Sequence, residues 1–511
     1  MSFFIVKRKG EMSMNMLANS MSKKANETVT ENGAYALSST GSHMVDLFSR
    51  VGSMRTLQAG QILTEFNCAF NEDNLLATKL MFYARDIREG LGERKTFRII
   101  LQDMAERHPE IVEKNIELIG LYGRFDDLYA LVDTPVEKQM WQYMRKQLDR
   151  DYEDMKAGKS VSLLAKWIKL PDSKSKVTSA LGSKTLNGMG FRKNRIEGIK
   201  MVKELRKYLE IPEIAIAAKE YSTIDYSKIA SQCMKHYKGA FAKNDSERFK
   251  QFMSDVRSGK TTVNAGAITP VEIVKSLIDW NSCQVKVRGT DVDVAEAQWN
   301  ALPNYAGDKN IIVMADTSGS MTWNGGDPIS TSISLALYFA ERNNGAFKNM
   351  FMTFSEEPKI IKVDECQDLP TKLSKIMKAP WGNNTNFERA YKMILDLAVK
   401  NHVPAEDMPE AIVVISDMQF DIACYASNDR SYVAHWKDAF EKQGYAVPRL
   451  VFWNVNSNYN NTQASKDDIG VTLLSGSSAT QFKSLVNTLT TTPEEYMLEV
   501  LNSERYAAVR V

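Results

Sequence analysis

The chain has 511 residues, of which 43% are hydrophobic and 25% are charged, and its formal net charge is only +2. This composition is typical of a globular protein, and the length favours two or more domains. No apolar run is long enough to cross a membrane. The first 19 residues contain three cations but no apolar stretch of the kind found in signal peptides. We therefore expect a protein that is not embedded in a membrane.

The charge is distributed unevenly along the chain. Residues 301–511 carry 19 Lys/Arg and 25 Asp/Glu, a net charge of −6, so residues 1–300 carry +8. The densest basic segment, residues 156–207, has 14 Lys/Arg against three Asp/Glu. Such asymmetry indicates separate roles for the two parts. It makes the first part the candidate for binding an anionic partner.

The five cysteines and five histidines argue against a disulfide framework and against a zinc site. The cysteines are scattered, odd in number and form no C-x-x-C pair, and the histidines form no H-E-x-x-H pair. Reduced thiols of this kind are typical of the cytoplasm, which is the location we expect.

The first 300 residues predict a lead-in followed by helices. Residues 1–41 are polar and aperiodic, which predicts a flexible segment. From residue 42 to residue 300, apolar residues recur at helical spacing, and the loops between these stretches are short. Pro109 and Gly123, for example, bracket one expected helix. The pattern predicts an α-helical domain of degenerate, HEAT-like repeats.

Residues 301–511 alternate short apolar runs with helical stretches. Four buried strands are expected, and they are Ile311–Ala315, Met350–Phe354, Ala411–Ile415 and Arg449–Asn454. Helices are expected between them at 329–343, 386–400 and 431–443, and closing helices at 481–490 and 493–503. This alternation predicts a doubly wound α/β domain with a parallel sheet.

Polar side chains follow three of the elements in this second domain. Asp316, Ser318 and Ser320 lie in a glycine-containing loop after the first strand, Thr385 lies in a polar loop, and Asp417 directly follows a later strand. Loops at the carboxyl ends of neighbouring parallel strands meet at one edge of a sheet. These hard oxygens suit Mg²⁺, with Mn²⁺ as the second choice. The alternative is ordinary turn chemistry that needs no metal.

This arrangement resembles the metal-ion-dependent adhesion site (MIDAS) of von Willebrand factor A domains. The resemblance implies that Ser318, Ser320 and Thr385 bind the metal directly, whereas Asp316 and Asp417 hold its waters or enter its shell. An open coordination position would then accept a carboxylate or phosphate oxygen from a partner. The sequence departs from the pattern after Asp417, because Met418 stands where many such domains have glycine.

Several stretches of the helical half carry a second resemblance. They are Thr30-Glu-Asn-Gly33, Tyr83-Ala-Arg-Asp-Ile-Arg-Glu-Gly-Leu-Gly-Glu-Arg94, Tyr122-Gly-Arg-Phe-Asp-Asp-Leu128 and residues 237–260. Together with the C-terminal domain they resemble an uncharacterised branch related to the TROVE-domain proteins, the group of the Ro autoantigen and its bacterial relatives. In that group a ring of helical repeats is closed by the metal-site domain and binds small non-coding RNAs and the ends of misfolded RNAs. The resemblance implies a helical-repeat RNA-binding protein.

The residues expected to contact RNA are the cations of the densest basic region. They are Lys184, Arg192, Lys193, Arg195, Lys200, Lys203, Arg206 and Lys207. Attraction of phosphates by such cations is the main sequence-independent term in RNA binding. The alternative is an exposed basic helix without a ligand. Trp167 and Phe191 could stack on bases, although single aromatic residues more often belong to a core.

Two motifs of mixed charge favour structural roles over an RNA channel. Residues 85–95 carry cations and carboxylates that can pair with one another, and Arg124 with Asp126 and Asp127 suits a clamp between helices. No nucleophile and base share a loop, so we expect that the protein is not an enzyme. Two alternatives to RNA binding remain open. One is a protein-interaction scaffold in which the metal captures an acidic partner, and the less favoured one is a metal-dependent hydrolase.

Overall fold

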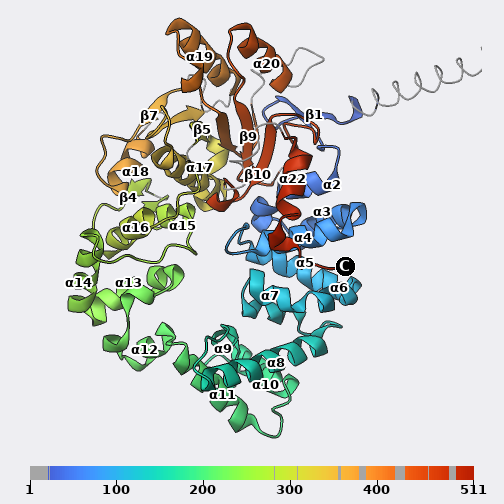
Figure 1. Cartoon of the computed structure of the whole chain (residues 1–511), viewed down its shortest axis with the longest axis vertical. Helices are drawn as coiled ribbons and strands as arrows, with labels where there is room; N and C mark the ends of the chain where they lie inside the picture. The colour runs from blue at the N-terminus through green and yellow to red at the C-terminus, as the bar shows by residue number, and fades with distance from the viewer. Residues whose placement is uncertain are drawn as a thin grey trace, which may run out of the picture.

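In the computed structural model, an arc of helices starts and ends on an α/β domain (Figure 1). The structure describes residues 21, 24–280, 282–307, 309–354, 358–378, 387–420, 432–458, 460–482 and 491–511. No helix in this described part is long and apolar enough to cross a membrane.

The first part of the arc is a stack of short helices that pack on their neighbours in sequence. α3, for example, contacts both α4 and α5. The predicted apolar face of α5 is confirmed, because its Phe97, Ile100 and Met104 are buried. The elements are α2 (His43–Phe48), η1 (Val51–Thr56), α3 (Ala59–Glu72), α4 (Asn74–Arg85), α5 (Arg94–Arg107), α6 (Pro109–Lys114), α7 (Ile116–Tyr122) and η2 (Phe125–Leu131).

The second part of the arc turns away from the α/β domain and then returns to it (Figure 1). The turning region is built on α8, whose Trp141 packs against Gly188; a Cβ at Gly188 would lie 2.5 Å from the Trp141 ring. The helices are α8 (Glu137–Lys156), α9 (Leu164–Trp167), α10 (Lys176–Gly188), α11 (Arg195–Tyr208), α12 (Pro212–Ala218), α13 (Ser231–Asn244), α14 (Ser246–Arg257), α15 (Pro270–Lys275) and α16 (Thr290–Asn300).

The α/β domain contains a six-stranded sheet in the order β10-β9-β8-β5-β6-β7. All neighbours are parallel except β6 and β7. β5 and β8 lie side by side although β6 and β7 separate them in sequence, so the winding direction reverses there. The strands are β5 (Ile311–Asp316), β6 (Met350–Phe354), β7 (Ile360–Lys362), β8 (Ala411–Ser416), β9 (Arg449–Asn454) and β10 (Val471–Ser475).

The sheet is covered by helices, as the alternating pattern predicts. α17 (Trp323–Arg342) contacts β5, β6 and β8. Further helices are α18 (Leu369–Met377), α19 (Phe387–Lys400), α20 (Tyr432–Lys442) and α22 (Pro493–Leu501). The four predicted strands are confirmed. The sheet contains two further strands, β7 and β10, that were not predicted. The closing helix predicted at 481–490 falls largely outside the described residues.

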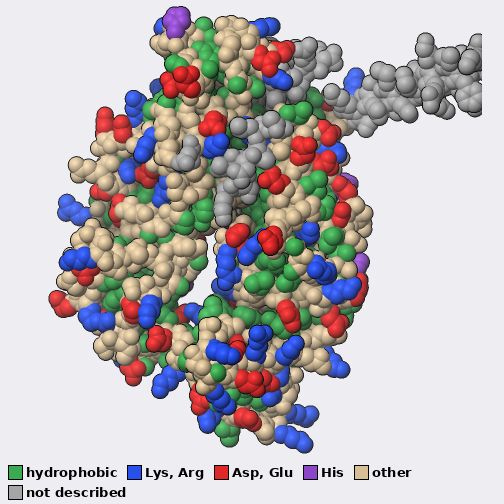
Figure 2. All heavy atoms as spheres, in the orientation of Figure 1, with side chains coloured by type: hydrophobic (Ala, Val, Ile, Leu, Met, Phe, Trp, Pro, Cys, Tyr) green, Lys and Arg blue, Asp and Glu red, His purple; other side chains and the backbone are tan. Residues whose placement is uncertain are grey.

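The two ends of the arc close on the α/β domain through different contacts. On one side Arg505 binds Asp86 of the segment after α4 through two hydrogen bonds of 2.7 and 2.9 Å. On the other side the Trp299 indole of α16 donates to Glu341 of α17 at 2.6 Å. The chain therefore forms a ring, and Figure 2 shows an opening in its middle that side chains do not fill.

The lead-in differs from the prediction of a flexible segment. Residues 24–41 are ordered around a small hairpin of β1 (Glu27–Val29) and β2 (Tyr35–Leu37). Leu37 pairs with Thr462 of the α/β domain through two backbone hydrogen bonds of 2.8 Å. The hairpin depends on partners more than 400 residues away, so local sequence patterns could not predict it. Residues 1–20 lie outside the described part.

Candidate functional site

The predicted metal-site carboxylates lie where the winding of the sheet reverses. Asp316 is the last residue of β5, and Asp417 immediately follows the neighbouring strand β8. Both carboxylates are almost completely buried, with 0% and 1% of their surface exposed. The carboxyl ends of strands at such a reversal are the usual ligand site of open α/β sheets.

The loop after β5 brings the predicted hydroxyls to the same place. Asp316 Oδ1 accepts a hydrogen bond of 2.9 Å from the backbone N–H of Ser318, and its Oδ2 accepts one of 2.5 Å from the hydroxyl of Ser416. The hydroxyl oxygens of Ser318 and Ser320 are 3.1 Å apart. The site thus joins Asp316, Ser318, Ser320 and Asp417. Thr385, the fifth predicted ligand, lies outside the described residues.

No cationic side chain among the described residues acts on the two carboxylates of this site. Asp417 Oδ2 is buried and has no hydrogen-bond partner among the described residues. Burial, and then repulsion from Asp417, raise the pKa of Asp316 above its ordinary value. Burial likewise raises the pKa of Asp417. A divalent cation fits these residues, because it would favour the ionised carboxylates and give Asp417 Oδ2 a partner.

The donor set also indicates which kind of cation fits. The described residues contain no group of three or more His, Cys, Asp or Glu side chains arranged to hold a metal. Two carboxylates and two hydroxyls are hard oxygen donors, which suit Mg²⁺ or Mn²⁺ that keeps part of its water shell. Asp316, Ser318, Ser320 and Asp417 are therefore the described oxygen donors at this edge of the sheet.

Met418 keeps the loop conformation that glycine would adopt. Its φ is +64°, in the left-handed region that non-glycine residues rarely occupy. The residue is also buried, and its N–H donates to the Ser416 hydroxyl at 3.0 Å. Met418 therefore adopts a backbone conformation that glycine adopts more readily. A strained residue beside two buried carboxylates is typical of a functional site.

The basic region of the arc contains a surface groove beside α8. The groove has a volume of about 660 Å³ and is lined by Trp141, Gln142, Arg145, Lys146, Asp149, Arg150, Glu153, Gly188, Met189 and Gly190. Arg145 joins α8 to the segment that forms the opposite side of the groove. The Arg145 guanidinium donates to the Met189 carbonyl at 3.2 Å and lies 4.0 Å from the centre of the Phe191 ring. We call this feature the α8 groove.

Exposed cations continue from the α8 groove along the chain. Arg192, Lys193 and Arg195 directly follow the Gly190 turn and are exposed. Arg192 and Lys193 have no ion-pair partner in the part of the chain that the structure describes. Lys146 and Arg150 of α8 are also exposed. Figure 2 shows Lys and Arg side chains over the lower part of the molecule, where Figure 1 places α8, α10 and α11.

The structure divides the other predicted RNA contacts into two groups. Lys200, Lys203 and Lys207 are exposed on α11. Lys200 lies 3.8 Å from Glu204, and Lys203 lies 2.8 Å from Asp172. Lys184 and Arg206, in contrast, bind other groups of the protein. Lys184 pairs with Asp133 at 2.5 Å and Glu137 at 3.1 Å. Arg206 donates to the carbonyls of Ala165 and Ile168 at 2.8 and 2.5 Å.

Arg206 differs from the expectation for a surface cation. Burial lowers the pKa of its guanidinium, and its hydrogen bonds to the end of α9 hold that short helix against α11. The two aromatic candidates are also covered. Phe191 is buried, and the Arg124 guanidinium lies 4.0 Å from the centre of the Trp167 ring. Phe191 is therefore not available for base stacking, and Arg124 covers part of the half-buried Trp167 ring.

The motifs of mixed charge form the expected structural network. Asp127 is fully buried and accepts from Arg85 and Arg98, both at 2.7 Å. Arg124 binds Asp126 through two nitrogens. Arg85 and Arg124 therefore have structural partners, as expected. The carboxylates of residues 85–95 pair with arginines outside that motif, Asp86 with Arg505 and Glu93 with Arg55, whereas Arg88, Arg94 and Lys95 are exposed.

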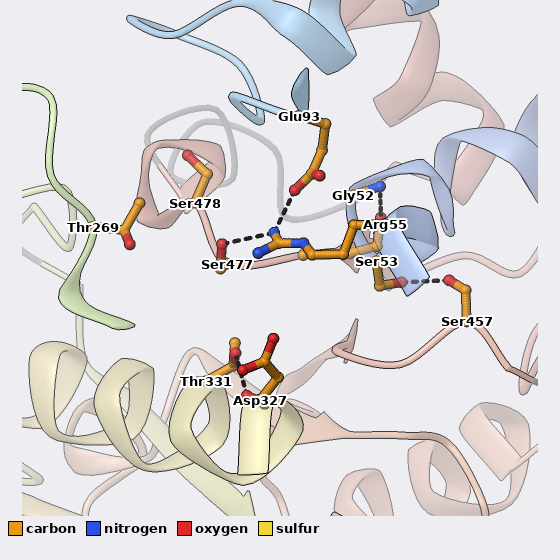
Figure 3. Close-up of polar contacts among 12 residues, drawn as sticks. Gly52, Ser53, Arg55, Glu93, Thr269, Asp327, Thr331, Ser457, Ser477 and Ser478 are labelled. Carbon is orange, nitrogen blue, oxygen red and sulfur yellow. Dashed lines mark hydrogen bonds and ion pairs between the residues drawn. The ribbon is translucent and has the colours of Figure 1, made fainter. Parts of the chain in front are cut away.

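A second group of cations was not predicted. Arg55 of η1, Lys235 of α13 and Lys275 of α15 are close enough that, after burial, repulsion from the other two lowers the pKa of Lys275. Each is also paired with a carboxylate, and Figure 3 shows Arg55 joined to Glu93 and Ser477. These cations come from distant parts of the chain, so no sequence signal joins them.

Two domain families of unknown function match the chain. Domain of unknown function (DUF2828) matches residues 30–155 and 189–306, and Domain of unknown function (DUF7788) matches residues 310–508. Uncharacterized protein L728 of Acanthamoeba polyphaga mimivirus is 27% identical, covering 93% of this chain and 87% of that protein. The Ro (RSR) protein of Deinococcus radiodurans is similar over 89% of this chain and 93% of that chain, at 13% identity and a TM-score of 0.35. We therefore base the functional proposal on the residues of this chain.

Proposed function

We propose that this protein is a cytoplasmic RNA-binding protein, not an enzyme, and that the α8 groove and the cations after it form its main RNA contact. The observation that carries this proposal is the exposed set Arg192, Lys193 and Arg195 beside Lys146 and Arg150. Two buried carboxylates of the arc, Asp86 and Asp127, are paired with arginines. The exposed cations Arg192, Lys193 and Arg195 are left to attract a polyanion.

RNA fits this surface better than a small anion. The cations are spread along a helix, a loop and the start of the next helix, which suits a chain of phosphates and not a single one. The Arg145–Asp149 pair, with N–O distances of 2.8 and 2.9 Å, keeps the groove wall rigid. Rigid cations lose less conformational entropy when they bind. The motif resemblance of the helical half to TROVE-type proteins supports the same ligand.

The test is a salt titration of RNA binding by fluorescence anisotropy. The variant carries Arg192→Glu, Lys193→Glu and Arg195→Glu, and the RNA is a labelled hairpin with a single-stranded end. We expect roughly 100-fold weaker binding at physiological salt and a smaller dependence of affinity on salt, by about one power of the salt concentration for each lost phosphate contact.

A matched control distinguishes a local effect of the groove cations on RNA binding from an effect of the net charge of the protein. Lys348, Lys400 and Lys442 are exposed on the α/β domain. Their triple reversal to Glu changes the net charge by the same amount, so it should leave RNA binding within about twofold if the contact is local. Equal losses in both variants would mean that only net charge matters. An unchanged affinity in the groove variant would refute the proposed contact.

A second function is supported by the carboxylate site of the sheet. We propose that Asp316, Ser318, Ser320, Asp417 and the undescribed Thr385 bind Mg²⁺ in a MIDAS-like site of a von Willebrand factor A-like domain. The supporting observation is the buried, unpartnered Asp417 Oδ2 beside Asp316. When bound, the metal would supply a Lewis-acidic position that can hold a carboxylate. The residues around it orient the two hydroxyls and exclude water from the carboxylates.

Isothermal titration with Mg²⁺, and with Mn²⁺ as a second probe, tests this site. Wild-type protein should bind one equivalent, and Asp417→Asn should not. Asp396 is an exposed carboxylate of the same domain, and Asp396→Asn should bind as wild type. No binding to the wild type would refute the metal site while leaving RNA binding intact.

A further inference from the structure

The α8 groove contains carboxylates as well as cations. Asp149 and Glu153 of α8 line it together with Lys146 and Arg150. Glu153 is exposed, and the side chain of Asp149 is 43% exposed. Carboxylates repel phosphates, but they accept hydrogen bonds from the N–H groups of nucleobases. The interior of the groove therefore differs in chemistry from residues 192–195, which carry cations and no carboxylate.

A stacked guanidinium forms part of the groove. The Arg145 guanidinium lies over the Phe191 ring, 4.0 Å from its centre. Phe191 is buried, whereas the Arg145 side chain is 36% exposed and lines the groove. The ring thus covers one face of the guanidinium, and the exposed part of Arg145 lies in the groove. Unpaired RNA bases stack on planar guanidinium groups as well as on aromatic rings.

Hydrogen bonds hold this guanidinium in place. Arg145 Nε donates to the two carboxylate oxygens of Asp149 at 2.9 and 2.8 Å, and Nη1 donates to the Met189 carbonyl at 3.2 Å. Gly190 keeps the space beside the guanidinium open. A Cβ there would lie 3.9 Å from Arg145 Nη1, and a φ of +85° disfavours any side chain at this position. A flat group held in this way loses little conformational entropy when it binds a base.

We propose that the α8 groove binds one unpaired nucleobase of single-stranded RNA, stacked on Arg145, and prefers a base that carries an exocyclic amino group. This inference rests on the RNA contact proposed above and adds recognition of a base to it. The groove volume of about 660 Å³ lies in the range of sites for small ligands. Lys146 and Arg150 are four residues apart on one side of α8, so they can hold the phosphates that flank the base.

The carboxylates of the groove provide the preference for an amino group. An ionised carboxylate can accept about four hydrogen bonds, so Asp149 keeps acceptor capacity beside its pair with Arg145. Glu153 lies one turn further along α8 and is exposed. Cytosine would donate its N4 amino group to such a carboxylate, whereas uracil presents the O4 oxygen at the same position and would be repelled.

Fluorescence anisotropy of the full chain with labelled oligo(C) and oligo(U) of equal length tests the preference. Both RNAs carry the same number of phosphates, so a difference in affinity reports the bases. We expect the wild type to bind oligo(C) about three- to tenfold more tightly. Glu153→Gln should reduce this difference, because an amide can accept from N4 of cytosine and also donate to O4 of uracil.

Arg145→Met distinguishes base stacking from phosphate binding. Methionine can still cover Phe191 but lacks a planar cation, so both RNAs should bind about tenfold more weakly. The salt dependence of binding should barely change, because Arg145 is already paired with Asp149. Arg107→Met and Glu106→Gln are matched controls on α5, where Arg107 also pairs with an aspartate one turn away and both residues are exposed. They should bind both RNAs as wild type.

Three results would overturn the base site. They are equal affinity of the wild type for the two RNAs, an undiminished preference in Glu153→Gln, and a salt dependence that falls by about one unit in Arg145→Met, which would make Arg145 a phosphate contact. Binding of the hairpin RNA but of neither oligomer would also overturn it. If the wild type binds none of these RNAs, the RNA contact itself is refuted, so the two failures are distinguishable.

Discussion

Buried carboxylates occur in both halves of the ring, and the two halves treat them differently. Asp86 and Asp127 of the helical arc are fully buried, and each is bound by an arginine at 2.7 Å. Asp316 and Asp417 of the sheet are as deeply buried, and among the described residues no lysine or arginine is paired with them. A buried, unpaired carboxylate is costly, so this pair favours a bound proton or a bound cation.

This difference separates structural charges from functional ones. In the arc, Asp127 is paired with two arginines of neighbouring helices and Asp86 with Arg505 of the C-terminal segment, and the cations around the α8 groove are exposed. In the α/β domain the uncompensated charge is negative and lies inside. The arc therefore suits an external anion, and the sheet suits a bound cation. Four experiments test this difference.

The largest effect should come from the arc. Arg505→Ala removes both hydrogen bonds to Asp86, which would keep only the Tyr506 hydroxyl, at 3.2 Å, from the C-terminal segment. An uncompensated buried carboxylate costs about 3–5 kcal/mol. Urea denaturation followed by tryptophan fluorescence should show this loss, with or without Mg²⁺. Arg510→Ala, an exposed arginine of the same segment, is the control and should stay within about 0.5 kcal/mol. Equal stability of Arg505→Ala and wild type would contradict the structural role.

The next largest effect should come from the sheet and should depend on the metal. At a Mg²⁺ concentration about 100 times the dissociation constant, the wild type should gain about 2.7 kcal/mol in free energy of unfolding. Asp316→Asn should lose this gain, because it removes one of the two charges that favour the cation. Thermal melts with EDTA and with Mg²⁺ measure the difference. A gain retained by Asp316→Asn would place the metal elsewhere.

The pH dependence of the metal-free protein is a third test. The pKa of Asp316 in the folded protein is raised by burial and by Asp417. The folded state therefore keeps a proton that the unfolded chain releases near pH 3.9. Stability should fall as the pH rises from that value through the folded pKa. Melts from pH 4 to 8 in EDTA should show this fall in the wild type but less of it in Asp316→Asn. Identical pH profiles would argue against the raised pKa.

The smallest effect should come from a surface pair beside the basic region. Lys203 is 58% exposed and lies 2.8 Å from Asp172. Exposed pairs contribute about 0–1 kcal/mol, so Lys203→Ala should barely change the unfolding midpoint. If Lys203 contacts RNA, the salt dependence of binding should still decrease by about one unit. A change in stability without a change in RNA binding would make Lys203 a structural residue.

The sequence predicts the parts of the fold whose signals are local. The runs Ile311–Ala315 and Ala411–Ile415 lie within observed strands, because continuous apolar runs between polar turns leave few other structures. β7 was missed because it is a three-residue edge strand with an exposed–intermediate–exposed pattern. The hairpin of residues 27–37 was missed because its hydrogen bonds join it to residues 419, 420 and 462.

Site residues could be predicted where the sheet topology brings them together. They could not be predicted where the contacts of individual side chains determine whether a residue is exposed or bound within the protein. Asp316 and Asp417 could be joined because each ends a strand of a parallel sheet. The sequence alone could not show that Arg206 binds backbone carbonyls whereas the adjacent Lys207 is exposed. The contact of the hairpin turn with the loop after Asp417 carried no sequence signal, since only the three-dimensional structure places Glu31 on Gln419.

Ultraviolet crosslinking of the protein to RNA, followed by mass spectrometry of the crosslinked peptides, tests the RNA-binding proposal most directly. If the α8 groove is the main contact, crosslinked peptides should come from α8 and from residues 188–207. The triple reversal of Arg192, Lys193 and Arg195 should abolish them, and EDTA should leave them unchanged. Crosslinks confined to the α/β domain, or lost with EDTA and retained in the triple variant, would contradict it.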